Sequence, residues 1–181
     1  MAFPREPAFV SAAPPPCARA FRRQLKRDPL GSDRTNSPMD PDSFDDPDVQ
    51  AAWLAERRAE AHDYLRAQQV PAGRVADHPA WHLAPYVSLW QVLGDRSGLP
   101  QYWVIVGDLP ADFLPADAVT SPRAAVAAFA QRWLHLGSLM LEGKPHPTLE
   151  IGSPDQNRNL GDLLLRRARL LADFAREDQH W

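Results

Sequence analysis

Hydrophobic residues take up a helical spacing directly after a start signal at residues 46–48. Asp46 can cap a helix, Pro47 suits the first helical position, and Asp48 places a carboxylate at the positive end of the helix dipole. From there apolar side chains recur with helical spacing up to about residue 69. The pattern predicts a helix with one apolar face, formed by Val49, Trp53, Leu54, Ala61, Tyr64 and Leu65.

Two segments with the character of strands follow this helix. Residues 86–93 read Y-V-S-L-W-Q-V-L and residues 102–106 read Y-W-V-I-V, both rich in β-branched and aromatic residues. A loop with two glycines separates them, which favours an antiparallel hairpin. In the second segment Trp103 and Ile105 fall on one side and the remaining residues on the other. Because both sides are apolar, we expect both faces of the sheet to be covered.

The second half of the chain again shows helix signals. The dipeptide S-P at residues 121–122 starts a helix predicted over residues 122–142, and the sequence E-G-K-P ends it. Residues 148–151 suit a short third strand, and a last helix is predicted over residues 160–178. This order of elements is typical of an α+β fold, in which three main helices pack on a small antiparallel sheet of two or three strands.

Charge divides the chain into two parts. Residues 1–38 carry seven basic and three acidic side chains, a net charge of +4, so a chain of net charge −3 leaves −7 for residues 39–181. The first part has little aliphatic content and cannot bury enough surface to offset the ~1–2 kcal/mol per residue that ordering costs. We expect a disordered tail over residues 1–38, added by an early start codon, then a linker over residues 39–47 and a single domain over residues 48–181.

Composition argues against several classes of protein. The longest apolar run has seven residues, far below the ~18 of a membrane-spanning helix, and a net charge of −3 is unlike that of a dedicated nucleic-acid binder. One cysteine excludes an intramolecular disulfide and a Cys-rich zinc module, which makes a cytoplasmic location the default. The chain contains no H-E-x-x-H, G-x-S-x-G, Walker or G-x-G-x-x-G motif. We therefore predict no cofactor, no metal, no nucleic acid and no membrane as partners.

Two longer segments resemble those of a known family. Residues 80–86 read A-W-H-L-A-P-Y, and residues 103–113 read W-V-I-V-G-D-L-P-A-D-F. With F-A-Q-R-W at residues 129–133 and the Leu-rich last helix, they are similar in order to a family of small bacterial domains of unknown function. The resemblance spans residues 48–181 and implies a stand-alone cytoplasmic domain without an assigned activity. It carries over no catalytic residue.

The same segments contain the candidate ligand or partner residues. Asp108 and Asp112 lie where a buried strand ends, and from there a carboxylate can act as a base or a metal ligand. The alternative for Asp108 is a hydrogen bond to its own turn. His82 suits either the wall of a pocket or a hydrogen-bonded position in the core or a turn. The candidates are Trp81, His82, Tyr86, Trp103, Asp108 and Asp112.

Two functions remain open from the sequence. We favour a non-catalytic binding or regulatory domain with a protein partner, because six tryptophans and three tyrosines supply residues that are enriched at interface hot spots. The alternative is a small hydrolase or metal-assisted enzyme. That function requires Asp108, Asp112 and His82 to converge within ~3–4 Å of one reacting atom. The sequence leaves the oligomeric state, the ligand and the biological process open.

Overall fold

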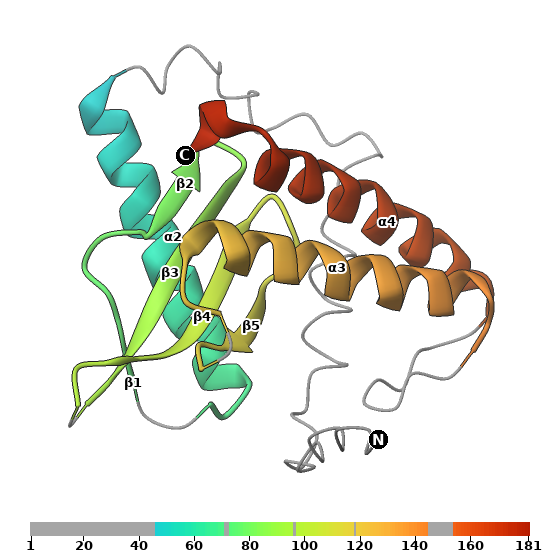
Figure 1. The fold of residues 1–181 in the computed structure, drawn as a ribbon, viewed down its shortest axis with the longest axis horizontal. Coiled ribbons are helices and arrows are strands. Elements are labelled where there is room, and N and C mark those ends of the chain that lie inside the picture. The colour runs from blue at the N-terminus through green and yellow to red at the C-terminus, as the bar shows by residue number, and fades with distance from the viewer. Residues whose placement is uncertain (1–45, 71–72, 96, 118, 145–153) are drawn as a thin grey trace, which may run out of the picture.

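A computed structural model describes residues 46–70, 73–95, 97–117, 119–144 and 154–181. Long helices and short strands follow one another along this part of the chain (Figure 1). The elements are α2 (Pro47–Ala67), β1 (Gly73–Val75), β2 (Trp81–Leu83), β3 (Val87–Gly94), β4 (Pro100–Gly107), β5 (Asp112–Pro115), α3 (Pro122–Leu141), α4 (Pro154–Arg176) and the 3-10 turn η2 (Asp178–His180).

The strands form one antiparallel sheet with β3 and β4 at its centre. β4 lies between β3 and β5, and the register places Trp90 opposite Val104 and Ile105 opposite Asp112. The other edge of β3 is shared by two short strands, since β2 pairs with the beginning of β3 and β1 with its end. The hairpin expected around the glycine loop is therefore confirmed as β3 and β4.

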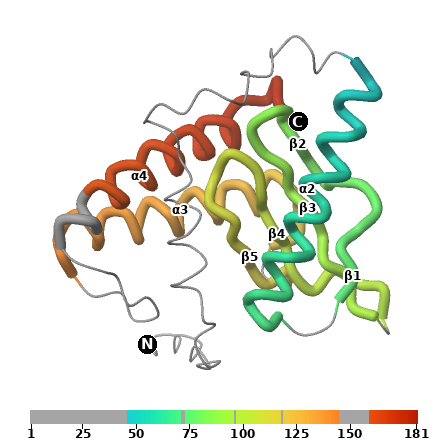
Figure 2. Tube along the Cα trace, turned by 180° about the vertical axis from the view of Figure 1, so that it is seen from behind, coloured from blue at the N-terminus to red at the C-terminus, as the bar shows by residue number. Residues whose placement is uncertain are grey.

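Helices cover both faces of the sheet, as the apolar character of both sides predicted (Figures 1 and 2). On one face Trp103 and Ile105 pack with residues of α3 and α4. On the opposite face Val104 and Val106 pack with residues of α2. The largest side chains that are completely buried include Trp90, Trp103, Trp133 and Phe129. The result is a three-layer α+β architecture.

The two helices on one face of the sheet pack closely because of two glycines. A Cβ atom at Gly137 of α3 would lie 2.7 Å from Cγ of Leu165 and 3.1 Å from the carbonyl oxygen of Gly161, both on α4. A Cβ atom at Gly161 would in turn lie 3.0 Å from Cβ of Met140. The helix backbones can approach this closely only because these side chains are missing.

The predicted helix starts are confirmed by their capping bonds. The carboxylate of Asp46 accepts a hydrogen bond from the backbone N–H of Asp48 at 2.9 Å, and the hydroxyl of Ser121 accepts one from Ala124 at 3.2 Å. Gly143 follows α3 with a φ of 65° and ends it. The third helix begins earlier than the sequence indicated, at residue 154 instead of residue 160.

The number of strands corrects the prediction of a sheet with two or three strands, because the described residues form five. The additional strands β1, β2 and β5 have only three or four residues each, too few to show an alternating pattern. The third strand predicted over residues 148–151 lies outside the described residues, as does the tail over residues 1–38. No described helix combines the length and the apolarity that spanning a bilayer requires.

Candidate functional site

Two of the candidate residues lie on opposite faces of the sheet. His82 pairs with Ser88, which pairs with Val106, and this places its side chain on the face that α2 covers. Asp112 pairs with Ile105 and places its side chain on the face that α3 covers. The sheet separates the imidazole from this carboxylate. The three side chains required by the enzyme hypothesis are therefore not brought together.

Asp112 is a buried carboxylate whose oxygens are already used. Its Oδ2 accepts a hydrogen bond from the indole Nε1 of Trp133 at 2.9 Å, and its Oδ1 accepts one from the backbone N–H of Phe113 at 2.8 Å. Nε of Arg132 lies 3.5 Å from Oδ2. Burial raises the pKa of Asp112, while Arg132 and the two hydrogen bonds act in the opposite direction. These contacts join β5 to α3, which is a structural role.

His82 lies against an aromatic ring on the other face. Its imidazole centroid is 6.5 Å from the ring centroid of Trp53 on α2, with the planes inclined at 41°. The side chain is half-buried, and burial lowers the pKa of His82 below its ordinary value. Burial thus favours the neutral imidazole over the charged one. On the same helix the guanidinium of Arg57 lies 5.9 Å from the Trp53 ring and pairs with Glu60 at 3.0 Å.

Asp108 lies in water beyond the end of β4. Its side chain is 70% exposed, and Nη2 of Arg167 on α4 lies 3.7 Å from its Oδ1. Its backbone N–H donates to the carbonyl of Tyr86 at 2.7 Å, so the loops after β2 and β4 are joined. Within the described ranges, no three His, Cys, Asp or Glu side chains are arranged so that they could hold a metal ion.

Trp103 and Tyr86 differ sharply in exposure. Trp103 is 1% exposed, and its indole Nε1 donates to the carbonyl oxygen of Val119 at 2.8 Å, which ties β4 to the segment before α3. Tyr86, in the turn between β2 and β3, is 45% exposed. Of these two aromatic candidates, only Tyr86 is available to a partner.

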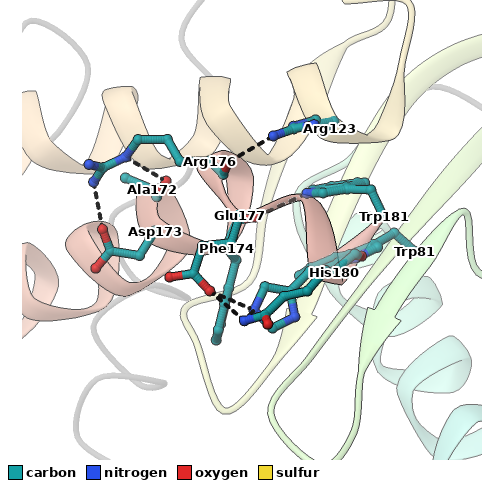
Figure 3. A network of polar contacts seen from close by, with 10 residues as sticks. Trp81, Arg123, Ala172, Asp173, Phe174, Arg176, Glu177, His180 and Trp181 are labelled. Carbon is teal, nitrogen blue, oxygen red and sulfur yellow. Dashed lines mark hydrogen bonds and ion pairs between the residues drawn. The ribbon is translucent and has the colours of Figure 1, made fainter.

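Trp81 belongs to a cluster at the C-terminal end of α4, which Figure 3 shows. Its indole Nε1 donates to the carbonyl oxygen of His180 at 2.6 Å, and its ring stacks on that of Trp181 with centroids 5.0 Å apart and planes inclined at 15°. Trp181 in turn donates to the carbonyl oxygen of Phe174 at 3.0 Å. We call this cluster the C-terminal clamp; it consists of Trp81, Arg123, Phe174, His180 and Trp181.

Arg123 closes the clamp from the start of α3. Its guanidinium donates to the carbonyl oxygens of Ala175 at 2.7 Å and Arg176 at 2.9 Å, and to the carboxylate of Asp178 at 2.7 Å. It also lies 6.0 Å from the ring centroid of Trp181. The carbonyls of Ala175 and Arg176, at the end of α4 where a helix leaves its carbonyls without intrahelical partners, are thus satisfied by one side chain.

Sequence reasoning did not select Arg123, His180 or Trp181 as site residues. Each reaches its partner across a large separation in the chain: 99 residues between Trp81 and His180, and 52 between Arg123 and Ala175. An arginine one position inside a helix start gives no local signal for such contacts. The unusual concentration of tryptophan was the available hint, because a large amphipathic ring needs both a partner surface and an acceptor.

Comparison with known proteins identifies the family of this chain. A family model described as "Domain of unknown function (DUF4826)" matches residues 48–181. The chain belongs to the DUF4826 family. The resemblance to a family of domains of unknown function is thereby confirmed. No curated protein and no solved structure matches the chain.

The DUF4826 domain presents exposed apolar side chains on one part of its surface. Tyr86 is 45% exposed, Leu170 45% and Trp181 39%. Trp181 stacks on Trp81 of β2 and donates to the carbonyl oxygen of Phe174, Leu170 lies one helical turn before Phe174, and Tyr86 lies in the turn that follows β2. In both ribbon views the end of α4 lies beside β2 (Figures 1 and 2). We call this surface the α4 face; it consists of Tyr86, Arg166, Arg169, Leu170, Arg176 and Trp181.

Proposed function

We propose that this DUF4826 protein is a non-catalytic binding domain whose partner is another protein with an acidic surface, bound at the α4 face. The observation that carries the proposal is the exposure of Leu170 and Trp181 on the C-terminal half of α4 and the segment after it, together with that of Tyr86 in the turn after β2. Exposed apolar side chains scattered singly need no explanation, but aromatic and apolar side chains that share a region with arginines are typical of binding sites.

The charge of α4 supports an acidic partner. Residues 154–176 contain five arginines, three aspartates and no lysine, a net charge of +2 in a region of the chain that carries −7 overall. Arginine is enriched in interfaces, whereas lysine is depleted. Arg166 and Arg176 pair with Asp162 and Asp173 on the same helix, and Arg169 is exposed. A partner with carboxylates around an apolar residue would match this pattern.

The geometry of the catalytic candidates favours binding over chemistry. Asp112 is engaged by Trp133 and Phe113, His82 lies on the other face of the sheet, and Asp108 is in water. General acid–base catalysis needs such groups within hydrogen-bond reach of one reacting atom. These three side chains are therefore not arranged to act on one reacting atom, which supports a binding function over a catalytic one.

Capture of a partner by the full chain and by surface variants tests the proposal. Leu170→Asp places a carboxylate at the centre of the α4 face, and Leu99→Asp makes the same change at a 67% exposed position in the loop between β3 and β4. We expect the wild type and Leu99→Asp to enrich one protein at least about tenfold more than Leu170→Asp does, since interface hot spots cost 2 kcal/mol or more when lost.

The identity and salt dependence of the captured protein complete the test. A protein with an acidic surface, released as the salt concentration rises, supports the proposed contact between charges. Equal recovery of all proteins by Leu170→Asp and by the wild type would refute the assignment of the α4 face. Recovery of a basic protein would refute the proposed chemistry of the partner.

A further inference from the structure

β5 is the last strand on its side of the described sheet, so one of its edges has no neighbouring strand. In an antiparallel ladder, successive residues point their N–H and C=O groups alternately toward and away from the partner strand. The N–H of Ala116 donates to the carbonyl oxygen of Gln101 at 2.9 Å, which fixes the alternation. The backbone groups of Phe113 and Pro115 therefore point away from β4.

Of these outward groups, both groups of Phe113 are engaged and Pro115 supplies no donor. The N–H of Phe113 donates to the carboxylate of Asp112 at 2.8 Å, and its carbonyl oxygen accepts from Nη1 of Arg132 at 3.1 Å. Pro115 has no N–H to offer. An arriving strand would need these groups, because strand addition depends on main-chain hydrogen bonds. The edge of β5 thus offers it no free donor at either position.

The two blocking side chains are held in place by α3. Asp112 is anchored by the indole of Trp133, and Arg132, the preceding residue of the same helix, reaches over the edge to Phe113. Nε of Arg132 also lies 3.5 Å from Oδ2 of Asp112. One turn of α3 therefore supplies both contacts. The ring of Phe113 packs on the opposite face, near Tyr64 and Tyr102.

We propose that Asp112, Arg132 and Pro115 together keep β5 from pairing with β5 of a second copy of the chain. Two unblocked edges would fit each other around a twofold axis at Leu114, where the N–H of residue 115 in each copy would donate to the carbonyl oxygen of Phe113 in the other. Unpaired edges of this kind are a recurrent cause of association between folded proteins, and inward-pointing charges and prolines are known protections. This role goes beyond the proposed function and uses a different surface.

The test opens the edge and leaves the Asp112 side chain in place. Arg132→Gln removes the guanidinium from the Phe113 carbonyl, and Pro115→Val restores an N–H to the strand. Arg66→Gln removes an exposed arginine that pairs with Asp63 on α2, and serves as a control for the loss of charge. We expect the double variant to associate with a dissociation constant at least about tenfold below that of the wild type, by sedimentation velocity, while Arg66→Gln behaves as the wild type.

Hydrogen exchange locates the association. Strand pairing at β5 requires that the amide at position 115 of the double variant become protected as the protein concentration rises. A double variant that has the melting temperature of the wild type but does not associate more strongly would overturn the proposal. Association that leaves the amide at position 115 without protection from hydrogen exchange would overturn it as well. Should the double variant melt early, Arg132→Lys combined with Pro115→Val decides, because lysine keeps a cation beside Asp112 while the planar guanidinium that reaches Phe113 is gone.

Discussion

Gly107 is the residue whose conformation most constrains the loops around the candidate residues. It has a φ of 137°, and a Cβ atom there would lie 2.4 Å from the carbonyl oxygen of Tyr86. That carbonyl accepts the N–H of Asp108, so the close approach is part of the hydrogen bond joining two loops. Gly143 also has a positive φ, 65°, but a Cβ atom there would meet nothing within 4 Å.

Alanine substitutions separate the cost of a positive φ, which both glycines share, from the cost of a close contact with Tyr86, which only Gly107 would meet. Gly143→Ala should lower the free energy of unfolding by about 1–2 kcal/mol, the cost of a left-handed conformation for a residue with a side chain. Gly107→Ala should cost about 1–3 kcal/mol more, since the backbone of Tyr86 has to move. Urea unfolding of both variants measures the difference. Equal losses for the two variants would show that the contact with Tyr86 carries no energy.

Asp112 leads to a prediction about pH. Because burial raises its pKa above that of the unfolded chain, the folded state binds the proton more tightly. The contribution that the protonated Asp112 makes to the free energy of unfolding is fully present below the pKa of Asp112 in the unfolded chain. It is lost as pH rises through the pKa of Asp112 in the folded protein. The free energy of unfolding of the wild type, minus that of Asp112→Asn, should therefore be larger at about pH 4 than at about pH 7. Urea titrations at both pH values measure this difference, and a flat or opposite trend would contradict it.

At the scale of elements, helices and the central hairpin could be predicted because their signals are local. Asp46 and Ser121 cap the helices they were expected to cap, and the alternation in β4 gave the correct face for Trp103. The short strands and the C-terminal clamp could not be predicted. Their stability comes from partners far away in the chain, which a single sequence does not reveal.

Arg123 allows the clamp to be tested as a unit. Arg123→Lys retains the charge but cannot reproduce three hydrogen bonds from one planar group, so it should cost about 1–3 kcal/mol. Faster exchange of the amides in residues 175–181 should accompany the loss. Arg176→Lys is the matched control, because an exposed pair on a helix surface contributes less than about 1 kcal/mol. Identical stability and exchange in the two variants would argue against the role given to Arg123.

The whole molecule shows which candidate residues had been interpreted correctly. The sequence placed Asp108 and Asp112 in one small segment, yet one is exposed and the other buried. Whether a carboxylate in or after a strand points into the core depends on the register of that strand in the sheet. Asp112 belongs to β5, which is too short to show an alternating pattern in the sequence. Tyr86, a candidate from the segment A-W-H-L-A-P-Y, lies at the surface.

Both edges of the sheet are protected by arginines, which has consequences for how the domain can bind. Nη2 of Arg58 on α2 donates to the carbonyl oxygen of Val75 in β1 at 3.0 Å, as Arg132 on α3 does to Phe113 in β5. Helices cover both faces of the same sheet. The proposed α4 face, which consists of side chains on a helix and on the segments beside it, agrees with this arrangement.

The stacked tryptophans of the C-terminal clamp also provide an optical signal. Two parallel indoles in contact couple their electronic transitions, so Trp81 and Trp181 should give a near-ultraviolet circular dichroism band that neither ring gives alone. Departure of residues 178–181 from β2 would abolish that band while the rest of the fold stays intact. The protein thus carries an internal chromophore pair that reports, without any label, whether its final turn is docked.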